Sequence, residues 1–147
     1  MKFDNSMILQ FDARSENEAF ARACVAAFVV PLAPTLEELN DIKTAISEAV
    51  TNCIVHAYLK KGGVVTVETG LCDKTVHIAV KDEGVGIENI EEAMQPFYTT
   101  KPDEERSGMG FTVMQTFMDT LSVSRNERLG TTVTMTKRIV GEERGGA

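Results

Sequence analysis

The sequence is poor in the residues that build metal sites and disulfide frameworks. Its 147 residues include three cysteines and two histidines, and no two cysteines are spaced as CxxC. A tetrahedral zinc site needs four such ligands close together, so we expect no zinc centre. Cys24, Cys53 and Cys72 stand far apart among apolar neighbours, which indicates reduced thiols within a core.

Long apolar runs and an excess of basic charge are also missing. The longest apolar stretch, ACVAAFVVPLA, is about half a membrane span and contains Pro31. Residues 1–10 are mixed polar and do not read as a secretory signal. The net charge of -7, from 15 basic and 22 acidic residues, disfavours a cation-lined nucleic-acid groove. We therefore expect a cytoplasmic protein with no membrane and no direct nucleic-acid contact.

What the sequence does contain is the strand and helix pattern of one domain. We expect residues 1–140 to form that domain and residues 141–147 to form a disordered polar tail. Two capping boxes, Ser15 with Glu18 and Thr35 with Glu38, predict two helix starts. The predicted elements are a strand over 6–13, helices over 15–31 and 35–57, strands over 64–71 and 75–82, a helix over 111–121, and strands over 122–127 and 131–140. Short turns pair neighbouring strands antiparallel, so the fold class is α+β with helices on one face of a sheet.

Three short stretches place polar or Gly-rich chemistry beside these elements. Glu48 and Asn52 lie one turn apart on the second helix, next to its apolar stripe. DEGVG (82–86) directly follows a strand, and RSGMGF (106–111) directly precedes a helix. Taken singly, the three also fit structural roles: an exposed polar pair, a loop with positive φ, and a tight turn.

Together, the first and third stretches fit the phosphate end of a magnesium–nucleotide complex. Backbone N–H groups and a helix dipole at SGMG can bind phosphates, and Gly108 and Gly110 permit the close approach. Asn52 offers a neutral carbonyl oxygen to magnesium, which takes most of its other ligands from water and phosphate. Glu48, one turn away, can then reach a hydroxyl group or a water near the γ-phosphate.

The second stretch fits the base end of the same ligand. Asp82 can accept a hydrogen bond from an exocyclic amine, while Gly84 and Gly86 let the backbone reach the ring. From Gly84 to Gly110 the chain is dense in Gly, Pro, Ser and Thr. A loop this long inside a compact domain is usually functional, and it is often a lid.

The same stretches resemble the N, G1 and G2 boxes of the ATPase/kinase superfamily of gyrase, Hsp90, histidine kinases and MutL. The matching motifs are EAVTN, DEGVG and RSGMGF, with GTTV near the end. A narrower resemblance, to the sporulation anti-sigma-F factors, rests on FDARSENEAFAR, SEAVTNCIVHAY, VKDEGVGI, PFYTTKPDEERSGMGF and MDTLSV. Proteins of that family are serine kinases as well as sigma-factor inhibitors.

The resemblance implies a Bergerat-type ATP fold, with helices on one face of a mixed, mainly antiparallel sheet and a mobile ATP lid. In the family pattern, Asn52 is the magnesium ligand and Glu48 is the catalytic carboxylate. Asp82 contacts adenine, aided by Thr131 of GTTV. The remaining nucleotide contacts implied are Gly84 and Gly86 at the base, and Thr99, Arg106, Ser107, Gly108, Met109 and Gly110 at the phosphates.

The resemblance also implies partners. The family forms homodimers, binds sigma factor F, and uses Mg2+ and ATP, with ADP as product, to phosphorylate an anti-anti-sigma protein on serine. The partner-binding arginine of the family falls at Arg22, which on its own reads as a solvated helix residue. The alternatives are a general-stress anti-sigma kinase, which shares the nucleotide residues, and a non-catalytic, ATP-clamped sigma-binding module, which has no need of Glu48. A plain hydrolase would release phosphate without an acceptor protein.

Overall fold

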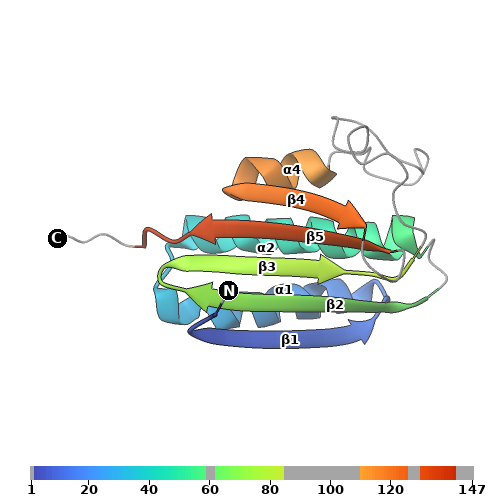
Figure 1. Ribbon diagram of the computed structural model, residues 1–147, viewed down its shortest axis with the longest axis horizontal. Helices are drawn as coiled ribbons and strands as arrows, with labels where there is room; N and C mark the ends of the chain where they lie inside the picture. The colour runs from blue at the N-terminus through green and yellow to red at the C-terminus, as the bar shows by residue number, and fades with distance from the viewer. Residues whose placement is uncertain (1, 59–61, 85–109, 126–129, 142–147) are drawn as a thin grey trace.

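Five strands form one sheet in the computed structural model, which describes residues 2–58, 62–84, 110–125 and 130–141. The strands are β1 (Asn5–Asp12), β2 (Val64–Cys72), β3 (Thr75–Lys81), β4 (Thr120–Arg125) and β5 (Thr131–Arg138). They lie in the order β1-β2-β3-β5-β4 (Figure 1). Every pairing between them is antiparallel, so the sheet that we expected to be mixed is antiparallel across the described strands.

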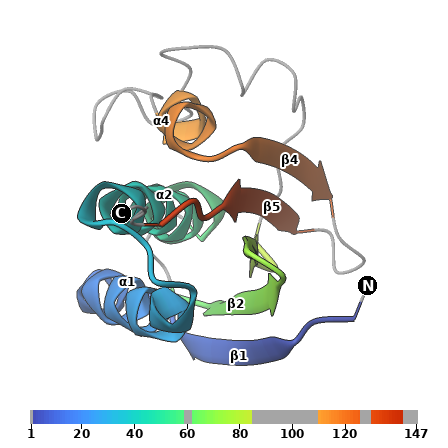
Figure 2. The ribbon, with the colours of Figure 1, turned by 90° about the vertical axis from the view of Figure 1, so that its left-hand side faces the viewer.

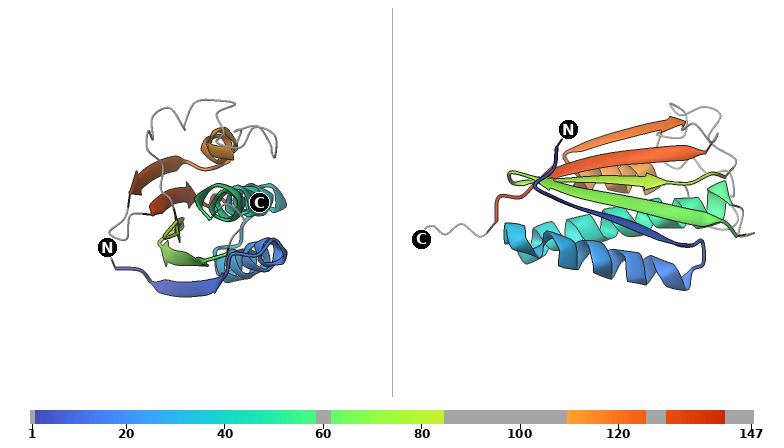
Figure 3. Two further views of the ribbon diagram at one scale, coloured as in Figure 1. Left: turned by 90° about the vertical axis from the view of Figure 1, so that its right-hand side faces the viewer. Right: turned by 60° about the horizontal axis from the view of Figure 1, so that its bottom comes forward.

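The helices lie together on one face of the sheet (Figures 2 and 3). They are α1 (Glu16–Val29), the short 3-10 turn η1 (Val30–Leu32), α2 (Leu36–Asn52), the π-helical turn η2 (Cys53–Ala57) and α4 (Gly110–Phe117). Strand residues at every second position face them and are buried: Val65, Val67, Leu71, Val76, Ile78, Val80, Val133 and Met135. This one-sided core confirms the predicted α+β class. Within the described parts of the chain, no helix has both the length and the apolar character needed to cross a membrane.

Helix α2 is the central helix, because it packs against both α1 and α4 (Figure 2). Its buried residues recur at three- and four-residue spacing, as a core-facing stripe requires: Ile42, Ala45, Ile46, Ala49 and Val50. At its start, the Thr35 hydroxyl accepts from the Glu38 N–H at 3.0 Å. The Glu38 carboxylate accepts in return from the Thr35 N–H at 2.9 Å. This second capping box is confirmed.

Helix α1 starts without the capping box that we predicted from Ser15 and Glu18. Ser15 has a helical backbone (φ -56°, ψ -37°), and its side chain makes no capping hydrogen bond. A capping residue needs an extended backbone to aim its oxygen at the first turn, so this prediction is wrong. The start of α1 is instead tied to the preceding strand, since Asn17 Nδ2 donates to the Asp12 carbonyl at 2.9 Å.

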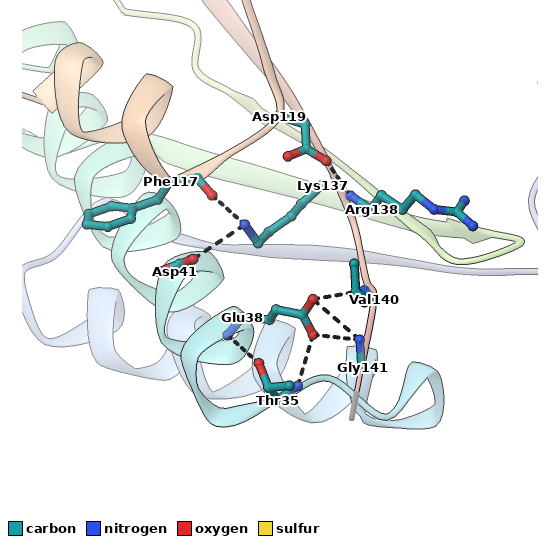
Figure 4. A network of polar contacts seen from close by, with 9 residues as sticks. All are labelled: Thr35, Glu38, Asp41, Phe117, Asp119, Lys137, Arg138, Val140 and Gly141. Carbon is teal, nitrogen blue, oxygen red and sulfur yellow. Dashed lines mark hydrogen bonds and ion pairs between the residues drawn. The ribbon is translucent and has the colours of Figure 1, made fainter. Parts of the chain in front are cut away.

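The carboxylate of Glu38 also joins the start of α2 to the end of the chain (Figure 4). Glu38 Oε2 accepts from the Val140 N–H at 2.8 Å, and Oε1 accepts from the Gly141 N–H at 3.1 Å. Gly141, the first residue of the predicted tail, is therefore held in place. Residues 142–147, the rest of that tail, lie outside the described residues.

Lys137 connects β5 to both α2 and α4 (Figure 4). Its Nζ donates to the carbonyl of Phe117, the last residue of α4, at 2.8 Å. The same Nζ pairs with Asp41 of α2 at 3.4 Å, and the two side chains are only 12% and 20% exposed. A cation at the C-terminal end of a helix is favoured by the helix dipole. The contacts of Lys137 thus hold α2 and α4 side by side, which matters because both helices contribute to the site described below.

Replacing Glu38 with glutamine should reduce the amount of folding free energy that the protein loses in acid. Burial raises the pKa of Glu38, but the N–H groups of Thr35, Val140 and Gly141 outweigh it and hold the pKa below its ordinary value of 4.5. A lowered folded-state pKa contributes stability that is present above the unfolded value and is lost as the pH falls through the folded value. Below about pH 4.5, urea titrations should therefore show a shallower decline for Glu38→Gln than for the wild type.

The matched control for this prediction is Glu37→Gln, because Glu37 is an exposed residue of the same helical turn. This control should keep the wild-type decline in acid. Equal declines in the wild type and in Glu38→Gln would show that the contacts of Glu38 carry no pH-dependent stability.

Candidate functional site

Asp82 lies at the end of β3 and is 5% exposed, with donors on both carboxylate oxygens. Its Oδ1 accepts from the Gly84 N–H at 3.0 Å and from the Thr131 N–H at 3.2 Å. The Cys53 thiol donates to Oδ2 at 3.6 Å. The backbone N–H of Asp82 donates in turn to the Thr131 carbonyl at 3.0 Å. The structure thus brings Asp82, Gly84 and Thr131 together.

The surroundings of Asp82 shift the pKa of its carboxyl group and the pKa of the Cys53 thiol. Burial raises the pKa of Asp82, and the N–H groups of Gly84 and Thr131 offset this only in part. Burial, with the nearby Asp82 carboxylate as a second cause, raises the pKa of the Cys53 thiol well above its ordinary value. Cys53 therefore stays protonated and serves as a donor. A buried carboxylate held in this way is suited to accept from a neutral amine of a ligand.

Glu48 and Asn52 lie one turn apart on α2, and the start of α4 packs directly against them. A Cβ atom at Gly110 would lie 3.3 Å from Asn52 Oδ1 and 3.3 Å from Glu48 Oε1. The described part of α4 starts at Gly110, and this residue lies against both polar side chains. Any side chain at Gly110 would crowd them. The structure therefore brings the first and third sequence stretches together.

The two clusters meet through consecutive residues of α2. Asn52 is the last residue of α2 and lies against Gly110, while Cys53, the first residue of η2, contacts Asp82. One end of α2 therefore touches both Gly110 of α4 and the buried carboxylate. A ligand with an anionic group at one end and an amine at the other would match this arrangement.

Several predicted site residues lie outside the described residues, so the structure gives them no position. They are Gly86, Thr99, Arg106, Ser107, Gly108 and Met109, and the predicted lid falls within the same gap. The side chain that we expect to bind magnesium, Asn52, lies within the described residues. Across the described ranges, no three His, Cys, Asp or Glu side chains gather as a metal site.

Arg22, read from the sequence as a solvated residue, is partly buried on α1. Its Nη1 donates to Glu18 Oε2 at 2.8 Å and to Ser47 Oγ on α2 at 3.1 Å. The side chain is 38% exposed. Because Ser47 directly precedes Glu48, Arg22 lies one contact away from the polar stripe of α2.

Besides Cys53, which was read as a core thiol, sequence reasoning missed two groups that support this site. A Cβ at Gly130 would overlap the carbonyl oxygen of Asp82, so only glycine allows β5 to approach this closely. The Tyr58 hydroxyl accepts from the Glu83 N–H at 2.7 Å, next to Asp82. Gly130 is the first residue of the GTTV motif and Tyr58 is the last residue of SEAVTNCIVHAY. Both motifs were recognised in the sequence, but neither indicates that these two residues make long-range contacts.

Comparison with known proteins identifies the family. The profile of the histidine kinase-like ATPase domain matches residues 11–137. The chain is 57% identical over 139 residues to the anti-sigma F factor of Caldanaerobacter subterraneus, covering 95% of this chain and 97% of that protein. The chain belongs to the anti-sigma F family of histidine kinase-like ATPases. A second anti-sigma F factor, from Clostridium perfringens, is 56% identical over 137 residues and is covered to 98% of its length.

Comparison with solved structures supports the fold of this ATPase family. The crystal structure of the RsbU and RsbW domains of a Mycobacterium tuberculosis protein matches with a TM-score of 0.64 at 20% identity. The match covers 92% of this chain and 32% of that one. At this identity the likeness shows the fold alone. With the family match, it confirms the predicted Bergerat-type α+β architecture.

Replacing Gly130 with alanine should destabilise the protein by displacing the segment after β3. The added Cβ would overlap the Asp82 carbonyl oxygen and lie 2.6 Å from Glu83 Cα, so backbone must move on both sides. Overpacking of this kind costs about 1–3 kcal/mol, which urea unfolding would detect. Thr134→Ala, at an exposed position of β5, is the control and should change little. An unchanged midpoint for Gly130→Ala would mean that β5 tolerates a side chain there.

Proposed function

We propose that this chain is an ATP-dependent protein-serine kinase and an anti-sigma factor. It binds sigma factor F, and it phosphorylates a serine of an anti-anti-sigma protein with Mg2+ and ATP. It acts in the cytoplasm as a homodimer whose protomers each use residues 1–140 as one domain. The observation that carries the proposal is the end of α2, where Asn52 lies against the start of α4 and Cys53 contacts Asp82.

The nucleotide is proposed to lie with its base at Asp82 and its phosphates at the start of α4. Asp82 accepts from the exocyclic amine of adenine, beside Thr131 and Gly84, which already hold its carboxylate. The N-terminal end of α4 attracts the phosphates through its dipole, and Gly110 leaves room for them. Gly86 at the base, and Thr99, Arg106, Ser107, Gly108 and Met109 at the phosphates, complete the proposed contacts.

The side chains of this site fit a magnesium ion. Asn52 presents an amide oxygen, a hard neutral ligand, in a cluster that also holds the Glu48 carboxylate beside Gly110. Magnesium is usually held by one or two protein oxygens together with waters and substrate phosphates. When bound, the ion would offset negative charge on the phosphates. Asn52 is the proposed ligand.

Glu48 is proposed to act on the incoming serine hydroxyl. Phosphoryl transfer passes through a loose transition state, so positioning and charge stabilisation dominate its catalysis. A carboxylate is too weak a base to deprotonate a free serine hydroxyl group fully. Glu48 therefore orients the hydroxyl and accepts its proton late in the transfer. Help of this type contributes about 10²–10⁴-fold.

Arg22 is proposed as a partner-binding residue on α1. Its guanidinium is partly exposed and is held by Glu18 and Ser47, so it is presented in one orientation. Fixed arginines lose less entropy on binding and are frequent anchors of protein interfaces. The anti-sigma F relatives favour sigma factor F over a general-stress sigma factor as the partner.

The Glu48→Gln variant tests whether the protein is a kinase or a non-catalytic, ATP-clamped module. It keeps the size and hydrogen-bonding capacity of the side chain but removes the proton acceptor. It should leave Mg-ATP and sigma binding nearly unchanged while slowing transfer of labelled γ-phosphate to the anti-anti-sigma protein by about 10²-fold or more. Asn52→Ala is the contrasting variant, and it should weaken magnesium-dependent ATP binding.

Two results would count against this assignment. Transfer at the wild-type rate by Glu48→Gln would remove its catalytic role. Release of labelled phosphate by the wild type without any acceptor protein being labelled would identify a plain hydrolase. Glu37→Gln, on the exposed first turn of the same helix, is the matched control and should keep full transfer.

Arg22→Ala should weaken partner capture without changing nucleotide affinity. Loss of an interface anchor costs about 1–3 kcal/mol, whereas the nucleotide groups lie on α2, α4 and the strands. Calorimetry with ATP and with the sigma factor measures the two effects separately. Arg138→Ala is the control, since Arg138 is exposed on β5 rather than on α1. Normal capture of both partners by Arg22→Ala would show that Arg22 only supports the packing of α1 against α2.

A further inference from the structure

The end of α2 is a single π-helical turn, and the proposed catalytic and metal-binding roles do not explain it. The turn η2 is closed by the Tyr58 N–H, which donates to the Cys53 carbonyl at 3.0 Å. π turns inside helices are rare and are often found at functional sites. Here the residues at the two ends of this hydrogen bond, Cys53 and Tyr58, both reach the segment Asp82–Gly84.

The hydroxyl of Tyr58 joins two backbone segments. It accepts from the Glu83 N–H at 2.7 Å and donates to the carbonyl of Val64, the first residue of β2, at 2.8 Å. The ring lies against Gly63, where an added Cβ would be 2.6 Å from ring atom Cδ1. Both hydrogen-bonding functions of the hydroxyl are therefore used, and the close contact with Gly63 restricts the ring.

The segment Asp82–Gly84 has three successive N–H groups, and each has a different partner. The Asp82 N–H donates to the Thr131 carbonyl, the Glu83 N–H donates to the Tyr58 hydroxyl, and the Gly84 N–H donates to Asp82 Oδ1. The last bond makes the orientation of the Asp82 carboxylate depend on the backbone of this turn. Tyr58 holds the middle of the turn, so its hydroxyl acts on the carboxylate through the backbone.

We infer that Tyr58 is a positioning residue for base selection. Its hydroxyl fixes the Glu83–Gly84 turn and thereby the orientation of the Asp82 carboxylate, which binds the purine. This inference rests on the proposed nucleotide site. A 6-amino purine donates to a fixed Asp82 carboxylate, whereas a 6-oxo purine places a second acceptor against it. A site built around a buried polar group rejects such an analogue strongly only while that group stays in place. Cys53, at the start of the same turn, holds Oδ2 from the other side.

The test compares Tyr58→Phe with the wild type in binding ATP and ITP, measured by calorimetry with Mg2+. The variant keeps the ring against Gly63 and removes only the hydroxyl. Loss of one neutral hydrogen bond should weaken ATP binding by about 3–10-fold. ITP makes no such bond to Asp82 and should weaken less, so the ratio of the two affinities should fall. A merely structural role would shift thermal stability and leave this ratio unchanged.

One control variant, one further variant and one measurement on the wild type complete the design. Thr120→Val removes a hydroxyl that pairs with Thr136 at 2.6 Å on the edge strand, and it should keep the wild-type ratio. Cys53→Ala removes the donor that faces Asp82 Oδ2 and should lower the ratio, as Tyr58→Phe does. In the wild type, the Glu83 amide should exchange with solvent at least about tenfold more slowly than an unbonded amide, although Glu83 is exposed.

The outcomes separate the two claims. If the wild type binds neither nucleotide, the proposed function fails, and this inference fails with it. If the wild type selects ATP and Tyr58→Phe selects it equally well, the inference alone is overturned. Equal weakening of both nucleotides in Tyr58→Phe, or an unprotected Glu83 amide in the wild type, also overturns it. A lowered ratio with a protected amide supports it.

Discussion

The arrangement of the site depends on a carboxylate that is buried with its hydrogen-bond donors around it. Asp82 is 5% exposed, and a charged oxygen at that depth is stable only where nearby donors replace water. Those donors come from the turn after β3, from the start of β5 and from the end of α2. Each of the three elements is therefore fixed relative to the others. Gly130 follows from the same constraint, because β5 can donate through Thr131 only if its backbone comes very close to that of Asp82.

Helix α2 turns this local constraint into a site with two ends. Its apolar stripe is buried in the core, which leaves the neighbouring stripe for Glu48 and Asn52. Consecutive helical residues point in different directions, so Asn52 and Cys53 reach the start of α4 and Asp82 respectively. Contacts at some distance from these groups also hold the helix in place: Glu38 binds the end of the chain, and Lys137 pairs with Asp41. Lys137 also binds the Phe117 carbonyl of α4 (Figure 4). Contacts distant from the candidate site thus help to fix its geometry.

Much of this arrangement could be predicted from the sequence, and the failures have physical causes. Strand alternation, the apolar stripe of α2 and the Thr35–Glu38 box are local patterns, and the structure contains all of them. The first capping box failed because its residue types do not determine the backbone angles of Ser15. Cys53, Tyr58 and Gly130 were not assigned to the site because a π turn and a close approach of backbones have no sequence period. The three chemical stretches were predicted to meet because one ligand required all of them. The structure places Gly110 of the third stretch against Glu48 and Asn52 of the first, whereas Asp82 of the second contacts Cys53, the residue after Asn52.

Asp82 has a structural role and a proposed recognition role in the same side chain, and this limits what its own substitution can reveal. Removing the carboxylate would leave the Gly84 and Thr131 N–H groups without their acceptor, inside a segment that also joins β3 to β5. An unsatisfied buried donor costs about 1–3 kcal/mol, so a loss of nucleotide binding would be mixed with a loss of folding. Residues that act on Asp82 through the backbone can be changed with less disturbance, because the carboxylate keeps its nearest donors. Substitutions at the neighbours of the buried carboxylate can therefore measure ligand recognition separately from folding stability.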